Sequence, residues 1–107
     1  MELLDEKLKY HQLYDIYGCL LTDKQRAYFS YHYFDDYSLS EIAKIMNVTR
    51  NAVHDQIKNT LGILDYYEEK LSLLSKRNKR QSIFKKAKED LSKEGYLGLI
   101  TELEKVE

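Results

Sequence analysis

Seven polar side chains between residues 40 and 58 have the types and spacing that suit contact with a nucleic acid. Hydroxyl and ammonium groups bind phosphate oxygens, whereas Arg, Asn and Lys side chains also hydrogen-bond with base edges. Asn51 carries the adjacent donor and acceptor that match adenine, and Arg50 and Lys58 suit phosphates or guanine edges. The residues predicted to contact duplex DNA are Ser40, Lys44, Thr49, Arg50, Asn51, His54 and Lys58.

Two features of the sequence oppose strong DNA binding. Asp55 lies among these residues, and its carboxylate repels phosphates unless it accepts a hydrogen bond from a cytosine amino group. The isoelectric point, about 6.3, is also low for a DNA-binding domain. Because phosphate neutralisation supplies most non-specific affinity, we expect weak binding that salt removes easily. A helix-turn-helix that serves only as a scaffold or a protein-docking adaptor therefore remains an alternative.

A second charged feature is a run of basic residues with no acid among them. The net charge is −1, but residues 1–49 hold eight acidic and five basic residues, and residues 50–107 hold ten acidic and twelve basic ones. Such a run attracts polyanions and makes RNA binding a further alternative, although a solvated helix face or a connector is its commoner meaning. The run consists of Lys76, Arg77, Lys79, Arg80, Lys85, Lys86 and Lys88.

The element that must position the DNA-facing residues is a helix-turn-helix from Ser38 to about Leu61. This unit needs a small residue where its helices approach and a turn residue that accepts a positive φ. It also needs an apolar turn residue that fills the core, a cap on the second helix, and branched apolar residues that face inward. The residues that meet these demands, in that order, are Ala43, Asn47, Val48, Thr49, and the pair Val53 and Ile57.

Two capping boxes mark helix starts. Thr22 with Gln25 begins a helix that is predicted to end at Phe34, and Ser38 with Glu41 begins the helix-turn-helix. In each box the first side chain caps the third helical N–H, and the second side chain reaches back to the N–H of the capping residue. The two boxes therefore predict separate helices on either side of a short polar break.

Apolar residues at spacings of three and four predict a first helix over residues 3–21. Gly18 lowers its helix propensity but is not expected to end it. Cys19 is predicted to be a small buried residue rather than a reactive thiol. The tyrosines of the first two helices are expected to lie in the core and at its rim.

The second helix of the helix-turn-helix has no clear stop before about Leu74 or Ser75. It is therefore expected to run for some 25 residues, roughly 37 Å. After the basic run, apolar residues over 83–91 predict one more helix, which the glycines of residues 95–98 end. Residues 99–107 are predicted to form a short last helix.

The chain is therefore expected to be one all-α domain over residues 1–107, with the helix-turn-helix at 38–61 and a C-terminal helical extension at 62–107. Its length suits one domain, and it has no Pro to interrupt long helices. No signal peptide and no apolar run long enough to span a bilayer is visible, so a cytoplasmic protein is expected.

The stretches that carry a likeness to a known family are Leu20–Gln25, Tyr37–Ala43, Val48–Val53 and Ile57–Lys58. Over nearly all of residues 1–85, the chain resembles the YlxM-type family of small helix-turn-helix proteins from Gram-positive bacteria. These are typically encoded beside the GTPase of the signal recognition particle. The chain is more distantly similar to the region-four domain of bacterial sigma factors, which reads promoter DNA. The resemblance implies an all-helical fold, a recognition helix that starts after Thr49, and a link to the signal recognition particle, whose components become candidate partners of a regulatory DNA-binding protein.

Catalysis and metal binding have little support in the sequence. His11 lies on the polar side of the first predicted helix, and His32 has no acid or Cys at ligand spacing. The single Cys excludes an internal disulfide and a cysteine-based zinc site. We therefore expect a protein that is not an enzyme and holds no metal or cofactor.

Apolar residues continue along the second helix of the unit beyond Leu61. Burying one Leu is worth about 1.5–3 kcal/mol, so leaving this stripe in water would be costly. The stripe can pack on the first helix of the same chain or on a second copy, and we favour a two-fold homodimer, which would double a weak DNA contact. The predicted dimer residues are Ile63, Leu64, Tyr67, Leu71 and Leu74.

Overall fold

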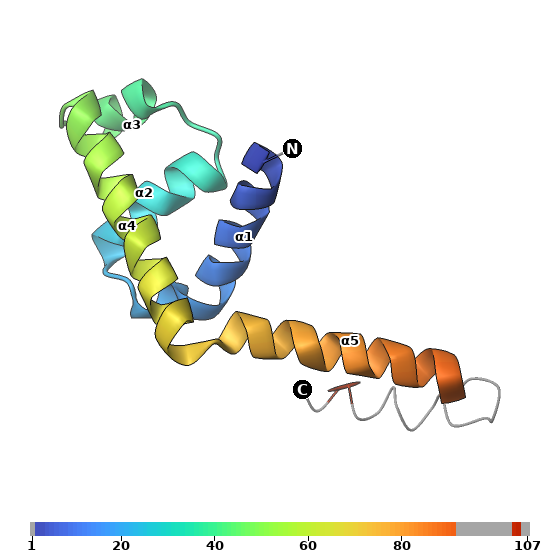
Figure 1. Cartoon of the computed structure of the whole chain (residues 1–107). Helices are drawn as coiled ribbons and strands as arrows, with labels where there is room; N and C mark the ends of the chain where they lie inside the picture. Colours follow the sequence, from blue (N-terminus) through green and yellow to red (C-terminus); the bar gives the residue numbers. More distant parts are fainter. Residues whose placement is uncertain (1, 92–103, 106–107) are drawn as a thin grey trace. The chain divides into compact units, whose positions relative to one another are not determined.

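The computed structural model describes residues 2–91, 104 and 105, and this part of the chain is all-α, as the sequence predicts (Figure 1). The helices are α1 Glu2–Tyr17, the 3₁₀ turn η1 Gly18–Leu20, α2 Asp23–Tyr33, α3 Leu39–Met46, α4 Arg50–Leu71 and α5 Leu73–Leu91. No helix in the described part is long and apolar enough to cross a membrane. The predicted break at residues 95–98 and nearly all of the predicted last helix lie outside the described residues.

The chain divides into two compact units, residues 1–72 and residues 73–107. Residues 62–71, which the sequence analysis assigned to a C-terminal extension, continue α4 and belong to the first unit. In the second unit, α5 contains the whole basic run. The further helix therefore begins at Leu73 instead of after the run, and the run is itself helical.

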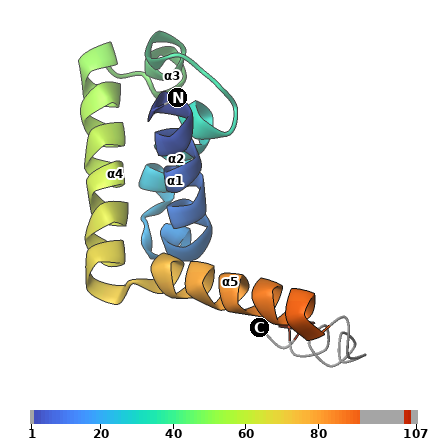
Figure 2. The ribbon, with the colours of Figure 1, turned by 45° about the vertical axis from the view of Figure 1, so that its right-hand side comes forward.

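The first unit is built around α4. In Figures 1 and 2, α1, α2 and α3 lie along one side of α4, and α4 contacts all three. Its buried residues are Val53, Ile57, Thr60 and Leu64, which recur every three or four positions and so share one face. Thr60 is fully buried, and its hydroxyl donates to the Gln56 carbonyl 2.9 Å away, which satisfies the one polar side chain of that face.

The N-terminal half of α4 closes the core of the helix-turn-helix. One buried cluster joins Tyr28 of α2, Ile42 and Ala43 of α3, and Val53 and Ile57 of α4. The inward positions predicted for Ala43, Val53 and Ile57 are thus confirmed. Ala43 is the smallest of the set, and it lies on α3 where α3 packs against α4.

The C-terminal half of α4 is fastened to α1 by two tyrosine–carboxylate hydrogen bonds. The Tyr10 hydroxyl donates to Asp65 Oδ2 over 2.8 Å, and the Tyr17 hydroxyl donates to Glu68 Oε1 over 2.7 Å. Burial, and then the hydrogen bond to Asp65, raises the pKa of Tyr10, so this hydroxyl stays protonated and keeps donating. Tyr17 is fully buried and stacks on Tyr67 with ring centroids 5.9 Å apart. Tyr10 and Tyr17 are therefore core residues, as predicted.

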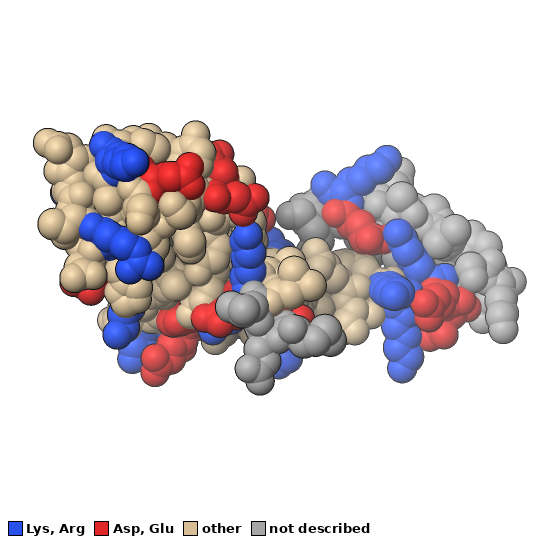
Figure 3. Space-filling model, turned by 90° about the horizontal axis from the view of Figure 1, so that it is seen from above, with Lys and Arg blue, Asp and Glu red and all other residues tan. Residues whose placement is uncertain are grey.

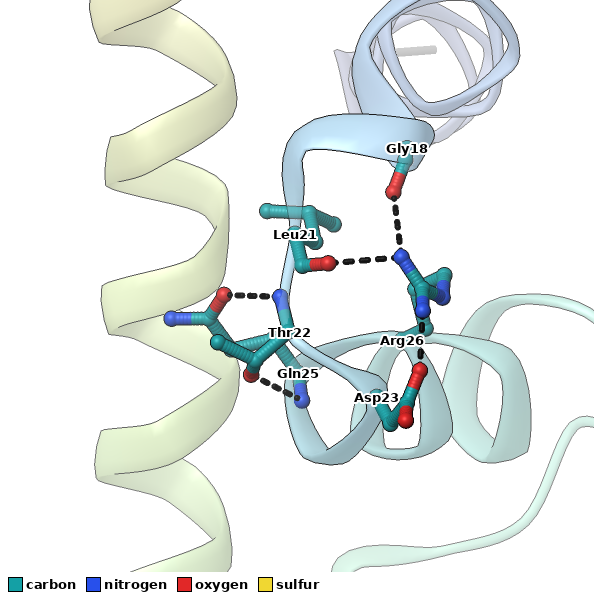
Figure 4. Close-up of polar contacts among 6 residues, drawn as sticks. All are labelled: Gly18, Leu21, Thr22, Asp23, Gln25 and Arg26. Atoms are coloured by element: carbon teal, nitrogen blue, oxygen red, sulfur yellow. Dashed lines mark hydrogen bonds and ion pairs between the residues drawn. The ribbon is translucent and has the colours of Figure 1, made fainter.

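The junction between α1 and α2 differs from the prediction, because α1 ends at Tyr17 and a 3₁₀ turn follows. Figure 4 shows the contacts that hold this turn: the Arg26 guanidinium donates to the carbonyls of Gly18 and Leu21 and pairs with Asp23. The side chain of one α2 residue thus holds the carbonyls at the two ends of the turn between α1 and α2. The prediction that Cys19 is buried is wrong, because this turn leaves its side chain exposed.

The turn between α3 and α4 has the predicted left-handed residue. Asn47 has φ 56° and ψ 49°, and its N–H donates to the Ala43 carbonyl. The Val48 N–H donates to the same carbonyl over 3.0 Å. The prediction that Val48 fills the core is wrong, since its side chain is 37% exposed. Ile42, Val53 and Ile57 already close the core, so the turn residue is left at the surface.

The end of α4 was also misjudged from the sequence. The helix stops at Leu71 after 22 residues, and Ser72 caps it in the left-handed region with φ 54°. The Ser72 N–H donates to the Glu68 carbonyl over 2.8 Å. Gly and Asn are the usual residues at this position, so a serine gives no stop signal in a sequence.

Both predicted capping boxes are present. The Thr22 N–H donates to Gln25 Oε1 over 2.9 Å, and the Ser38 N–H donates to Glu41 Oε1 over 3.0 Å. Each second residue donates its own N–H to the hydroxyl of the first. The Ser38 backbone N–H, and then its hydroxyl, hold the pKa of Glu41 below its usual range. The two boxes are thus alike in geometry, but only the one on α3 carries a titratable group.

Asn47→Ala is expected to destabilise the fold by about 1–2 kcal/mol, because alanine has a Cβ that disfavours the left-handed region and no side chain to compensate. Asn47→Gly is the matched control and is expected to leave stability nearly unchanged, since Gly adopts this region freely. Urea unfolding followed by circular dichroism measures both. Equal losses for the two variants would contradict the role given to the backbone conformation.

Acidification is expected to loosen the cap of α3 and to leave the cap of α2 unchanged. Because the pKa of Glu41 is lowered in the folded chain, its bond contributes stability above the ordinary carboxyl pKa, about 4.3, and the contribution is lost as pH falls through the lowered value. Gln25 does not titrate. An NMR titration of the Ser38 and Thr22 amide shifts checks this, with Glu41→Gln removing the response of Ser38. If the Ser38 amide shift did not change with pH, or if the Ser38 and Thr22 shifts changed equally, the proposed role of Glu41 in the cap would be ruled out.

Candidate nucleic-acid interface

The seven residues predicted to contact DNA are all exposed and all belong to the helix-turn-helix. Two lie on α3, one caps α4, and four lie on the first turns of α4. In order, they are Ser40, Lys44, Thr49, Arg50, Asn51, His54 and Lys58. The structure therefore brings the whole predicted set to one end of the first unit.

On α4, the helical period separates the core side from the side available to a ligand. Val53 and Ile57 face the core, so Asn51, Asp55 and Lys58 fall on the opposite side. We call this side the outer face of α4. A helix that enters the major groove presents such a face to the base edges, chiefly over its N-terminal turns.

The α3 side of the interface offers phosphate contacts. Ile42 and Ala43 are buried, whereas Ser40 and Lys44 are exposed on the same helix. Thr49 Oγ1 accepts a hydrogen bond from the Ala52 N–H over 3.1 Å and so caps α4. An oxygen that accepts in this way leaves its own O–H able to donate, so Thr49 can cap the helix and contact a phosphate together.

The charge at this end of the first unit is mixed. Figure 3 looks down on it from the α3 end and shows acidic side chains close to basic ones. His54 Nδ1 lies 3.6 Å from Asp55 Oδ1, with both side chains mostly exposed. Residues 1–72 hold twelve acidic and eight basic residues. The interface thus lacks the dense positive charge of strong non-specific DNA binders.

A groove of about 730 Å³ continues from the outer face of α4 toward its C-terminal half. We call it the outer groove, and its lining residues are Leu20, Gln25, Asp55, Lys58, Asn59, Gly62, Ile63, Tyr66 and Tyr67. Gly62 lies in a helix interior, where it costs about 0.5–1 kcal/mol relative to Ala. This groove could not be predicted from the sequence, because Leu20 reaches it from η1, a turn that the periodicity did not predict.

The predicted dimer stripe is partly corrected by the structure. Leu64 is fully buried within the chain, so it is unavailable to a second copy, and Leu74 is also buried. Tyr67 is occupied by its stacking on Tyr17 of α1. The sequence left two choices for this stripe, α1 of the same chain or a second copy, and α1 covers Tyr67. Leu71 remains exposed.

The structure also describes the surroundings of His11 and of the basic run on α5. Among the described residues, no group of three or more His, Cys, Asp or Glu side chains could hold a metal ion. His11 packs edge-on against Phe34, with ring centroids 4.8 Å apart. On α5, five of the seven basic residues of the run are exposed, and Lys88 pairs with Glu104 over 2.7 Å.

Comparison with known proteins also indicates a helix-turn-helix protein. Residues 4–104 match the model of the UPF0122 family, described as "Putative helix-turn-helix protein, YlxM / p13 like". A UPF0122 protein of Halalkalibacterium halodurans is 50% identical over 92 residues, which cover 86% of this chain and 84% of that protein. The UPF0122 protein YlxM of Bacillus subtilis is 44% identical over 108 residues, 97% of this chain and 98% of that protein. The chain therefore belongs to the UPF0122 family of YlxM/p13-like helix-turn-helix proteins.

Proposed function

We propose that this chain is a regulatory DNA-binding protein that reads duplex DNA with the first turns of α4. One observation supports this most: Asn51 and Lys58 are exposed on the outer face of α4, opposite the face fixed in the core, and Arg50 is exposed in the first turn of the same helix. A recognition helix needs both properties, because its side chains must reach base edges while its backbone keeps one orientation.

In the proposed complex, α4 lies in the major groove and α3 crosses the backbone. Asn51 pairs with an adenine edge, and Arg50 contacts a guanine edge or a phosphate. Lys44 and Ser40 contact phosphates beside the groove, which sets the register of α4 without reading sequence. The mixed charge of this end keeps the affinity modest, and salt weakens the phosphate contacts that supply it.

Several finer parts of the proposal rest on the family resemblance and on sequence. They are the regulatory role, the cytoplasmic location, the link to the signal recognition particle, the absence of catalysis, and the homodimer. Pulldown of this chain with purified signal recognition particle components would test the protein link. Its failure would leave DNA binding untouched, because the two use separate partners.

RNA binding through α5 is a second candidate function. It is favoured by the exposure of five basic residues on one helix, Lys76, Lys79, Arg80, Lys85 and Lys86. A polyanion contact of this kind is electrostatic and does not require base readout. Neutralising Lys79, Arg80, Lys85 and Lys86 would remove it and leave the α4 interface intact.

Arg50→Glu combined with Lys58→Glu is expected to abolish sequence-specific DNA binding. Each lost phosphate contact lowers the slope of log K against log salt by about 0.9, so the double variant should lose up to about 2 units of slope. The variant should still fold, because Arg50 is the first residue of α4, where a carboxylate interacts well with the helix dipole. A salt titration on a pool of duplexes, with unlabelled competitor, measures the effect.

Lys24→Glu combined with Lys70→Glu is the matched control, since it makes the same change in net charge on two exposed lysines outside the α4 N-terminal turns. It should keep sequence preference and lose affinity only slightly. Binding that the Arg50 and Lys58 reversals leave intact would refute the proposal. If neutralising α5 alone removed binding, the polyanion site would belong to α5 and RNA would become the leading ligand.

A further inference from the structure

The outer groove exposes apolar side chains beside a helical glycine. Leu20 is 51% exposed and Tyr66 is 55% exposed, and both line the groove with Ile63 and Gly62. The groove lies wholly within the first unit and runs along α4 on the side away from its buried face. Exposed apolar side chains that gather around a hollow are typical of a docking surface.

Gly62 has no structural reason within the single chain. A Cβ built on it would meet no atom within 4 Å, whereas a Cβ on Gly18 would meet the Tyr14 ring at 3.3 Å. Glycine lowers the stability of a helix interior relative to alanine, so the missing side chain brings no gain in the monomer. It does leave the backbone of α4 open to the close approach of another helix.

We propose that α4 of a second copy of this chain docks antiparallel in the outer groove and crosses α4 at Gly62. The residues that flank Gly62 favour a second copy because they are arranged symmetrically about it. Lys58 and Tyr66 lie four positions before and after Gly62, one helical turn to each side. A two-fold axis at Gly62 therefore brings each Lys58 to Tyr66 of the other copy, twice over.

This pairing is chemically favourable in the antiparallel arrangement and unfavourable in the parallel one. Antiparallel crossing sets a lysine ammonium against a tyrosine ring, which is a cation–π contact. Within the chain, Lys70 Nζ already lies 5.7 Å from the Tyr66 ring centroid, so this ring attracts cations, and a ring has two faces. Parallel crossing would set Lys58 against Lys58. Leu20 and Ile63 supply the apolar area beside the crossing.

The dimer also regulates the proposed DNA contact, an effect that rests on the proposed function. Lys58 belongs both to the outer groove and to the DNA-facing set. A second copy in the groove removes Lys58 from the phosphates, so this dimer competes with DNA, unlike the dimer expected from the sequence, which would double the DNA contact. The fraction of dimer, and with it the availability of Lys58, responds to protein concentration.

The test is Gly62→Ala, studied in the full chain by thermal unfolding and by sedimentation velocity at rising protein concentration. Alanine fits the open space and favours the helix, so the variant should unfold at a higher Tm than the wild type. The same Cβ should push the second helix away and raise the dissociation constant of the dimer by at least about tenfold. A substitution that acted only on the folding of the single chain would not raise the Tm and weaken the dimer at the same time.

Ser82→Ala on α5 is the matched control, because it gains helix propensity outside the groove and should leave dimerisation unchanged. Tyr66→Ala, which removes the ring that faces Lys58, should weaken the dimer as Gly62→Ala does. A wild type that stays monomeric at every concentration, a Gly62→Ala dimer as strong as wild type, or a less stable Gly62→Ala variant would overturn the proposal. Sedimentation is measured without DNA, so it tests the dimer independently of DNA binding. If the wild type did not bind DNA, that result would refute only the proposed function.

Discussion

The first unit depends on α4 burying one face along its whole length. Val53, Ile57, Thr60 and Leu64 repeat at helical spacing, and three other helices pack against the face they form. Because that face is fixed, the opposite one is fixed as well, and it carries Asn51, Asp55 and Lys58. The orientation of a surface built for a ligand is thus set by packing in the core, since a rigid helix cannot turn one side without the other.

The two halves of α4 are held by different forces. The N-terminal half is held by apolar contacts with α2 and α3, in the cluster that includes Tyr28 and Ile42. The C-terminal half is held to α1 by the hydroxyls of Tyr10 and Tyr17 in addition to packing. A hydroxyl bonded to a carboxylate is directional, so it fixes the position of α1 along α4 more closely than apolar packing alone does.

The sequence predicted features that local chemistry determines. The two capping boxes and the left-handed Asn47 follow from residue types that satisfy open N–H groups or accept a positive φ. Features that depend on distant residues were missed. The end of α1 depends on Arg26 reaching back from α2, and the exposure of Val48 depends on a core already closed by α4. Ser72 ends α4 although serine is no usual C-cap, and the outer groove exists only where η1 and α4 meet.

The placement of charge along α4 has a consequence for how the molecule meets a partner. Its N-terminal half holds Arg50, Lys58 and a single acid, whereas its C-terminal half holds three acids, Asp65, Glu68 and Glu69, and one lysine. Glu68 accepts a hydrogen bond from the Tyr17 hydroxyl, and Asp65 pairs with Lys9 of α1 over 3.1 Å, so α1 offsets part of this negative charge. The helix is therefore an electric dipole with its positive end at the turn after α3. In the field of a polyanion α4 taken by itself is drawn with its N-terminal turns foremost, and the acidic side chains of the other helices at that end oppose this attraction.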